Sequence, residues 1–259
     1  MCGIAGFISF DGHDQDDAAA RVQRMTDAIV HRGPDAGGRY VDGQAALGHR
    51  RLSIIDLASG AQPMGAAGGE VQIVFNGEIY NFIELRRELE GLGHRFATNS
   101  DTEVILQAYL AWGDGCVERL AGMFAFAIWD RRNRSLLLAR DRVGKKPLYV
   151  WREGRRIAFA SELKALRAGG LCPDALDPEA LDCYFTFGYI PSPRTVYRGV
   201  RKLAAARCVT VTADGERERT YWRLTGIEER GPSAADLDEA ADAFESLLDD
   251  AVRARLVAE

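Results

Sequence analysis

The second residue of the chain is a cysteine, a position that can join two reactive groups on one residue. The sequence begins Met1-Cys2-Gly3-Ile4-Ala5-Gly6, and removal of an initiator methionine normally exposes a small residue at position 2. A free α-amine titrates at about pH 7.7–8.0 and a thiol at about pH 8.5. The amine can therefore take the thiol proton and later deliver it to a leaving amine. Cys2 is predicted to be an N-terminal nucleophile; the alternative is a buried cysteine without a chemical role.

An Asn-Gly pair further along the chain fits the same chemistry. Attack on an amide develops negative charge on its oxygen, and donors must be directed at that oxygen. Asn76-Gly77 follows the apolar run Val71–Phe75, so a strand end there would offer a side-chain amide and a backbone N–H. The alternative is a type I′ hairpin turn, for which Asn-Gly is the typical sequence.

Three charged residues suit the ends of a zwitterionic amino-acid substrate. Arg51 can hold a carboxylate through a bidentate fork, and Glu78 and Asp101 can hold an ammonium group. Taken singly, each is explained as well by a solvated surface charge.

Composition narrows the class of protein and its partners. The chain has 259 residues and a formal net charge of -5, which argues against general binding to nucleic acid or an anionic membrane. It has no apolar run near the roughly 18 residues of a spanning helix, and no secretion signal at its start. Its five cysteines form no CxxC pair and its four histidines show no ligand spacing, so no metal site is expected. The expected location is the cytoplasm.

The spacing of apolar residues predicts an α+β protein. Two helices lie between several strand pairs, which suggests two antiparallel sheets with helices packed against them. An amphipathic helix is expected near the C-terminus, with Leu237, Phe244 and Leu248 on its apolar face. The expected helices are 16–30, 81–92 with Asn81 as its cap, one from Ser100 or Asp101, 178–187 and 235–257, and the expected strands are 3–10, 38–41, 44–49, 70–76, 123–129, 135–140, 147–151, 156–160 and a pair within 200–212.

Several motifs in this order resemble those of the class II glutamine amidotransferases, a family of N-terminal-nucleophile enzymes, and most resemble those of the glutamine-dependent asparagine synthetases. The likeness is dense over about the first 170 residues. The motifs are Met1–Gly6, His31–Asp35, His49–Asp56, Phe75–Asn81, Ser100–Glu103, Gly122–Ala127, Ala139–Tyr149 and Phe159–Leu166.

The resemblance implies an αββα sandwich, with Cys2 as the nucleophile and Asn76 and Gly77 as the oxyanion hole. It implies that L-glutamine is the substrate, with its ammonium held by Glu78 and Asp101. Its carboxylate would be held by Arg51 together with the backbone of Leu52, Ser53, Ile54 and Ile55.

The resemblance also predicts two parts, a glutaminase domain over 2–170 and a linker with a truncated start of a synthetase-like domain over 171–259. The family's phosphate-binding Ser-Gly-Gly-x-Asp-Ser loop does not occur in this sequence. No cofactor is therefore expected in this chain, and ATP and Mg would act only in the missing synthetase domain.

The partner of this chain is left open in two respects. The C-terminal helix would pack either on a separate synthetase domain or chain, or back on the first domain, and a homodimer is a further alternative. The alternative to an enzyme is a non-catalytic module that binds glutamine or docks on a separate synthetase chain. Such a module would need the residues that hold the charged ends of glutamine, but not the thiol.

Overall fold

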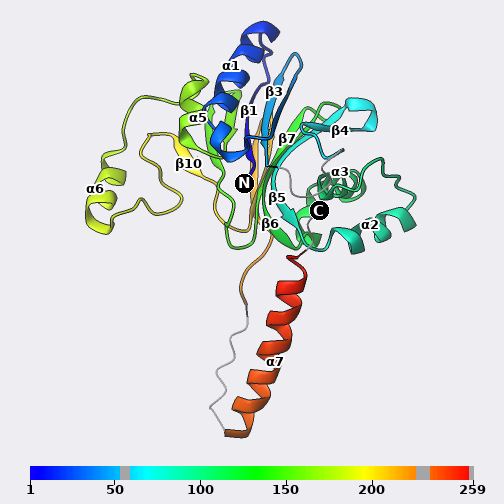
Figure 1. Cartoon of the computed structure of the whole chain (residues 1–259). Helices are drawn as coiled ribbons and strands as arrows, with labels where there is room; N and C mark the ends of the chain where they lie inside the picture. The colour runs from blue at the N-terminus through cyan, green and yellow to red at the C-terminus, as the bar shows by residue number, and fades with distance from the viewer. Residues whose placement is uncertain (53–58, 226–233, 257–259) are drawn as a thin grey trace.

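The computed structural model describes residues 1–52, 59–225 and 234–256, and shows two facing β-sheets with helices on both outer sides (Figure 1). Within these residues each sheet has six strands, and each strand runs antiparallel to its neighbours in the sheet. This arrangement confirms the predicted αββα sandwich.

The first sheet carries the N-terminus on one of its inner strands, with the strand order β10-β8-β9-β1-β3-β2. Its β1 pairs with β3 on one side and with β9 on the other. The strands are β1 (Gly3–Ser9), β2 (Ala36–Val41), β3 (Ala45–Arg51), β8 (Tyr149–Glu153), β9 (Arg156–Ala160) and β10 (Val200–Lys202).

The second sheet has the order β12-β11-β7-β6-β5-β4. Its long central strands, β5 and β6, pair over nine residues, from Val71 with Asp130 to Ile79 with Gly122. The strands are β4 (Met64–Ala66), β5 (Val71–Ile79), β6 (Gly122–Asp130), β7 (Ser135–Arg140), β11 (Arg207–Thr212) and β12 (Gly215–Thr220).

Three apolar cores hold the four layers together. The middle core joins the inner faces of the sheets and contains Ile4, Val74 and Trp129, all fully buried. A second core lies between the first sheet and α1 and α5, and a third between the second sheet and α2, α3 and α4. The helices are α1 (Gln15–Asp27), α2 (Phe82–Gly91), α3 (Asp101–Trp112), α4 (Cys116–Arg119) and α5 (Leu163–Ala168).

The Asn-Gly pair does not form a turn. Asn76 and Gly77 lie inside β5, opposite Ala125 and Phe124 of β6, so the hairpin alternative is wrong and the strand runs past the expected end at residue 76. Pairing along β6 overrides the local turn preference of Asn-Gly. Helix α2 begins as predicted, but the Asn81 side chain bonds Arg119 O and Ala121 N and does not cap the helix.

The segment 200–212 was expected to form a strand pair, but its two strands join different sheets. β10 pairs with β8 of the first sheet, whereas β11 pairs with β7 and β12 of the second. Residues 200–220 therefore complete both sheets, and the boundary predicted at residue 170 does not coincide with the end of either sheet. The division into 2–170 and 171–259 stays a prediction.

Two helices stand apart from the layers. In Figure 1, α6 (Pro178–Phe187) projects on one side, and α7 (Ala234–Arg253) extends away from the sheets. The α7 side chains Leu237, Phe244 and Leu248 are 61%, 66% and 51% exposed. An ion–aromatic contact between Arg255 and Tyr80 joins the end of this segment to the body. No helix in the described part of the chain is long and apolar enough to cross a membrane.

Candidate active site

Cys2 immediately precedes β1 and lines a cavity that both sheets help to form. The cavity has a volume of about 380 Å³, which lies within the range of small-molecule sites, about 300–1,000 Å³. The residues around it come from the N-terminus, from β3, β5, β6 and the start of α3, and from the loops after β3 and β7. They are Met1, Cys2, Arg51, Leu52, Gly60, Gln62, Phe75, Asn76, Gly77, Glu78, Ser100, Asp101, Thr102, Met123 and Lys146.

The thiol of Cys2 is held by the backbone that follows β3. The Leu52 N–H lies 3.4 Å from Sγ, and Sγ lies 3.5 Å from Leu52 O. Burial raises the pKa of this thiol, and the hydrogen bond from Leu52 and the nearby positive charges of the N-terminus, Arg51 and Lys146 oppose that effect. The positive groups thus favour the thiolate that a nucleophile needs.

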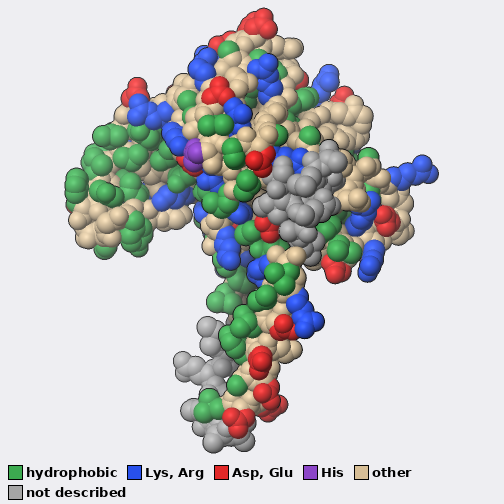
Figure 2. Space-filling model, in the orientation of Figure 1, with side chains coloured by type: hydrophobic (Ala, Val, Ile, Leu, Met, Phe, Trp, Pro, Cys, Tyr) green, Lys and Arg blue, Asp and Glu red, His purple; other side chains and the backbone are tan. Residues whose placement is uncertain are grey.

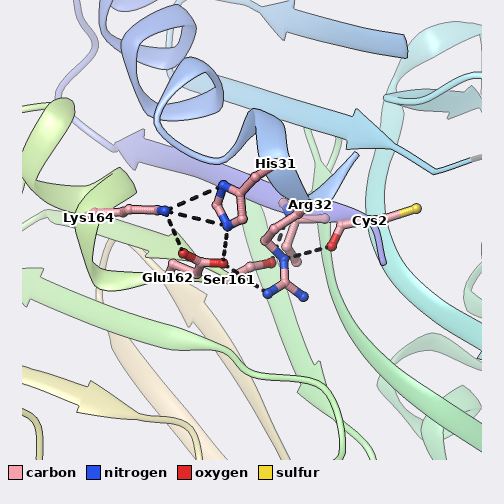
Figure 3. A network of polar contacts seen from close by, with 7 residues as sticks. Cys2, His31, Arg32, Ser161, Glu162 and Lys164 are labelled. Carbon is pink, nitrogen blue, oxygen red and sulfur yellow. Dashed lines mark hydrogen bonds and ion pairs between the residues drawn. The ribbon is translucent and has the colours of Figure 1, made fainter. Parts of the chain in front are cut away.

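The carbonyl of Cys2 is held by an ionic network on the other side of the residue. Figure 3 shows the sulfur directed away from this network. Arg32 donates from Nε to Cys2 O at 2.9 Å and from Nη1 to Glu162 at 3.0 Å, and Glu162 also contacts His31 and Lys164. The network fixes the backbone of Cys2 while leaving its sulfur in the cavity.

The edge of β5 directs backbone N–H groups toward the cavity. Strand β4 pairs with β5 only as far as Ile73, so within the described residues the later part of this edge has no neighbouring strand. Phe75 N donates to Gln62 Oε1 at 2.6 Å, and Ile79 N donates to Asp101 Oδ2 at 3.0 Å. Since N–H directions alternate along a strand, the N–H of Gly77 points from the same edge, between these two bonded groups.

Asn76 turns its side chain to the space between the sheets, on the same face of β5 as Val74 of the middle core. It is 1% exposed, and neither Nδ2 nor Oδ1 has a hydrogen-bond partner among the residues that the structure describes. Such an orphaned buried amide is costly, about 1–3 kcal/mol. An unpaired amide that lines a cavity is a ready donor for a bound oxygen.

Buried His49 supports this strand from the first sheet. Its Nε2 lies 3.0 Å from the carbonyl of Phe75, the residue before Asn76. Burial lowers the pKa of His49 to about 4, so the ring is neutral at pH 7 and donates this hydrogen bond. The contact links the two sheets directly beside the Asn76 amide.

Asp101 is the first residue of α3 and reaches the same cavity. Ser100 caps this helix by accepting from Thr102 N, and Glu103 accepts from the backbone of Ala97 and Thr98, which fixes the loop before the helix. Burial, together with the nearby charge of Glu78, raises the pKa of Asp101 to about 6, although the hydrogen bonds from the backbone of Ile79 and Thr102 oppose this rise. A cationic ligand between these two carboxylates would relieve both effects.

Most of the predicted site residues therefore meet in one cavity. Cys2, Arg51, Leu52, Asn76, Gly77, Glu78 and Asp101 all line it. Arg51 ends β3 and is 9% exposed. Ser53, Ile54 and Ile55 lie outside the described residues, so their predicted role is not addressed by the structure.

Several cavity and support residues were not predicted to act. Lys146, Gln62 and Thr102 line the cavity, and Arg32, which is itself bonded to Glu162, holds the Cys2 carbonyl. Arg32, Lys146 and Glu162 lie in segments that carry the family resemblance, so motif membership was the available signal; helical or strand periodicity gave none. Among the described residues, no cluster of three or more His, Cys, Asp or Glu side chains could hold a metal ion.

A family model described as "Glutamine amidotransferase domain" matches residues 1–222. The chain belongs to the class II glutamine amidotransferases. The matched residues of this amidotransferase include every predicted site residue and all the strands of both sheets.

Relatives with curated names have sequences similar to that of the amidotransferase. It is 36% identical over 262 residues to asparagine synthetase [glutamine-hydrolyzing] 3 of Bacillus subtilis, which covers 100% of this chain and 42% of that protein. Asparagine synthetase [glutamine-hydrolyzing] 1 of the same organism is 40% identical over 227 residues, 86% of this chain and 35% of that protein. The chain thus spans less than half the length of these two relatives.

A solved structure has the same fold. Glutamine phosphoribosylpyrophosphate amidotransferase of B. subtilis superposes with a TM-score of 0.61 over 86% of this chain and 50% of that one, at 19% identity. This likeness confirms the fold predicted from the sequence, that of the N-terminal-nucleophile hydrolases.

Proposed function

We propose that this amidotransferase hydrolyses the side-chain amide of L-glutamine to glutamate and ammonia, with Cys2 as its nucleophile. One observation carries the proposal: the Cys2 thiol shares a cavity with a buried, unpartnered amide from Asn76 and with charges suited to an amino acid. Each group has a simpler explanation alone, but their convergence in one cavity has none.

The reaction requires that Met1 is removed, so that the amine of Cys2 becomes free. This amine takes the thiol proton while sulfur bonds to the amide carbon of glutamine. Asn76 Nδ2 and the N–H of Gly77 then stabilise the oxyanion. When the C–N bond breaks, the amine returns the proton to the leaving nitrogen, which departs as ammonia. Water next attacks the glutamyl thioester, which releases glutamate and restores the thiol.

The substrate's own charges fix its orientation. We assign its α-carboxylate to Arg51, with the Leu52 backbone and the segment Ser53, Ile54 and Ile55 beside it. We assign its α-ammonium to Glu78 of β5 and Asp101 at the start of α3. In this orientation the side-chain amide would lie beside Cys2.

We further propose that the ammonia serves amidation of a carboxylate by a synthetase domain or a separate synthetase chain. The names of the two B. subtilis relatives support asparagine synthesis, that is, aspartate as the acceptor. ATP and Mg would act in that domain, and this chain would need no cofactor. Hydrolysis would reside in residues 2–170, with 171–259 leading toward the synthetase part, and the expected location is the cytoplasm.

Two exposed apolar surfaces are consistent with such a partner. Figure 2 shows apolar side chains gathered over α6 and along α7. On and after α6, Phe185 is 82% exposed and Tyr189 is 63% exposed. Apolar patches of this kind usually mark protein interfaces, and a second copy of the chain is the other candidate to cover them.

The experiment compares ammonia and glutamate release from L-glutamine by the wild type, Cys2→Ala and Cys172→Ala. Cys172 is a free, half-buried cysteine outside the cavity, so its variant should keep the wild-type rate. Cys2→Ala should lose hydrolysis and still bind glutamine by calorimetry. Equal background rates in all three proteins, with glutamine bound, would favour the non-catalytic binding module.

A further inference from the structure

The loop after β7 presents a buried lysine to the cavity. Lys146 is 6% exposed and lines the cavity together with Cys2 and Glu78. Its side-chain nitrogen forms no hydrogen bond or ion pair with any residue in the described part of the chain. Buried lysines are rare unless paired, and nothing in the proposed reaction so far uses this one.

The loop is held in a single shape around Asp141. This fully buried carboxylate accepts from the backbone N–H groups of Phe124, Val143, Lys145 and Lys146, at 2.9–3.2 Å. Arg140 closes the loop by donating to the carbonyls of Gly144 and Lys146 at 2.7 Å each. Because Phe124 is paired with Gly77, the same carboxylate ties the lysine to the strand of the predicted oxyanion hole.

Charged groups from several segments of the chain act on Lys146. Its pKa is lowered by burial, and the neighbouring groups act on it in both directions. Glu78, Cys2 and Asp141 favour its charged form, whereas Arg32 opposes it. The positive groups that act on Cys2 are the amine of Met1, Arg51 and Lys146. The ammonium and the thiol therefore act on each other across the cavity.

From this geometry we infer that Lys146 is an electrostatic positioning residue, whose ammonium stabilises the thiolate of Cys2 while the nucleophile forms. Only the expected effect on glutamine hydrolysis rests on the proposed function. The effect of Lys146 on the thiol holds with or without glutamine. A structural role is the competing explanation, in which Lys146 serves only to neutralise Glu78.

The test measures how fast iodoacetamide alkylates Cys2 between pH 6 and 10, by mass spectrometry of the N-terminal peptide. The variants are Lys146→Met, Lys146→Arg and Lys145→Met. Methionine keeps the length and apolar stem of the side chain without its charge. Lys145 is the adjacent, exposed lysine, so its variant removes the same charge outside the cavity.

In Lys146→Met the alkylation midpoint should move to higher pH, and the rate at pH 7 should fall about tenfold, as expected for a one-unit rise in the thiol pKa. For glutamine hydrolysis, kcat should fall by a similar factor with KM within about twofold. Lys146→Arg and Lys145→Met should stay near the wild type. Lys146→Gln replaces the methionine variant if circular dichroism shows that it is unfolded.

An unchanged alkylation midpoint in a folded Lys146→Met protein would overturn the inference, and a rise in KM alone would assign Lys146 to the neutralisation of Glu78. Failure of the proposed function gives a different result: the wild type would release no ammonia, while the midpoint would still shift in Lys146→Met and not in Lys145→Met.

Discussion

The two-sheet body and the C-terminal helix carry the same apolar pattern, and only the body buries it. Helix α1 buries Ala18, Val22 and Met25 completely or nearly so. On α7, by contrast, Phe244 and Leu248 remain more than half exposed. Periodicity therefore identifies a helix and its apolar face, but it does not identify the surface that covers that face.

The comparison extends to polar groups. In the body, buried carboxylates such as Asp141 and Glu103 each accept several hydrogen bonds, as buried charges must. The Asn76 amide departs from this rule inside the cavity. Exceptions in the body thus point to a ligand, whereas exposure on α7 points to a partner, and the variants below separate these two meanings.

Gly77→Ala should have the largest effect. A Cβ at this position would collide with the carbonyl oxygen of Met123 and lie 2.8 Å from Phe124 Cα, so β5 would have to shift. We expect loss of about 3 kcal/mol of stability and no measurable ammonia release. Gly91→Ala is the control, because its Cβ would meet nothing within 4 Å. Comparable urea midpoints for the two variants would contradict the close packing of β5.

Asn76→Ala should lower kcat by about 10²–10³-fold, as loss of one oxyanion donor does, with little change in KM. Removal of the unpaired amide relieves a cost of about 1–3 kcal/mol, and the loss of side-chain packing offsets this gain, so net stability should hardly change. Asn81→Ala is the matched control, with the opposite pattern. It loses bonds to Arg119 and Ala121 and should be destabilised by about 1 kcal/mol at unchanged kcat. A normal kcat for Asn76→Ala would remove it from the site.

Asp101→Asn should raise KM for glutamine by about tenfold at pH 8, since the ammonium loses one charged partner. The wild-type KM should rise as pH falls below about 6, where Asp101 takes up a proton. The folded protein binds the Asp101 proton more tightly than the unfolded chain does, because the pKa is about 6 in the folded state and about 3.9 in the unfolded state. The stability that this proton contributes to the wild type is therefore lost as pH rises from about 4 to 6. Asp101→Asn should therefore be the more stable protein at pH 8, by up to about 3 kcal/mol, and gain nothing at pH 3.5.

Urea unfolding of the wild type and of Asp101→Asn, at pH 8 and at pH 3.5, tests which protein is the more stable at each pH. A variant that is less stable than the wild type at pH 8, with unaltered KM, would mean that the carboxylate serves α3 and β5 and not the substrate.

The smallest effect is expected on α7. Leu248→Ala should change the free energy of unfolding by no more than about 0.5 kcal/mol and leave ammonia release unchanged, because the side chain is half exposed. The matched leucine in the body is Leu89 of α2, fully buried, whose replacement by Ala should cost about 2–5 kcal/mol. Similar losses for both would show that α7 packs on the body in solution.

The sequence predicted the elements of this fold better than their partners. Helix α6 spans the expected residues 178–187, and the strands from 123 to 160 lie where apolar runs and polar turns predicted them. Local patterns failed where distant pairing decides. Asn76 and Gly77 are part of a strand because they pair with β6. Strand β10 pairs with β8 at the edge of the first sheet and not with β11, which follows it in sequence.

For the candidate site, the family resemblance predicted residues that the spacing alone left ambiguous. Arg51, Glu78 and Asp101 are unrelated in local pattern, and only the folded chain brings them to one cavity. The bond from Arg32 to the Cys2 carbonyl spans 30 residues of sequence, and the bond from Arg32 to Glu162 spans 130. No local signal encodes such contacts, because they arise where η1 (Val30–Arg32) lies against β3 and α5 lies against β9, the two strands that flank β1.

The most direct test examines the first residue of the active protein. The wild type is mixed with L-glutamine, quenched in acid within milliseconds, and its N-terminal peptide is analysed by mass spectrometry. We predict a peptide that begins at Cys2 and carries one glutamyl group, which is absent from Cys2→Ala. Full ammonia release by protein that retains Met1, or turnover with the glutamyl group on another residue, would contradict the account.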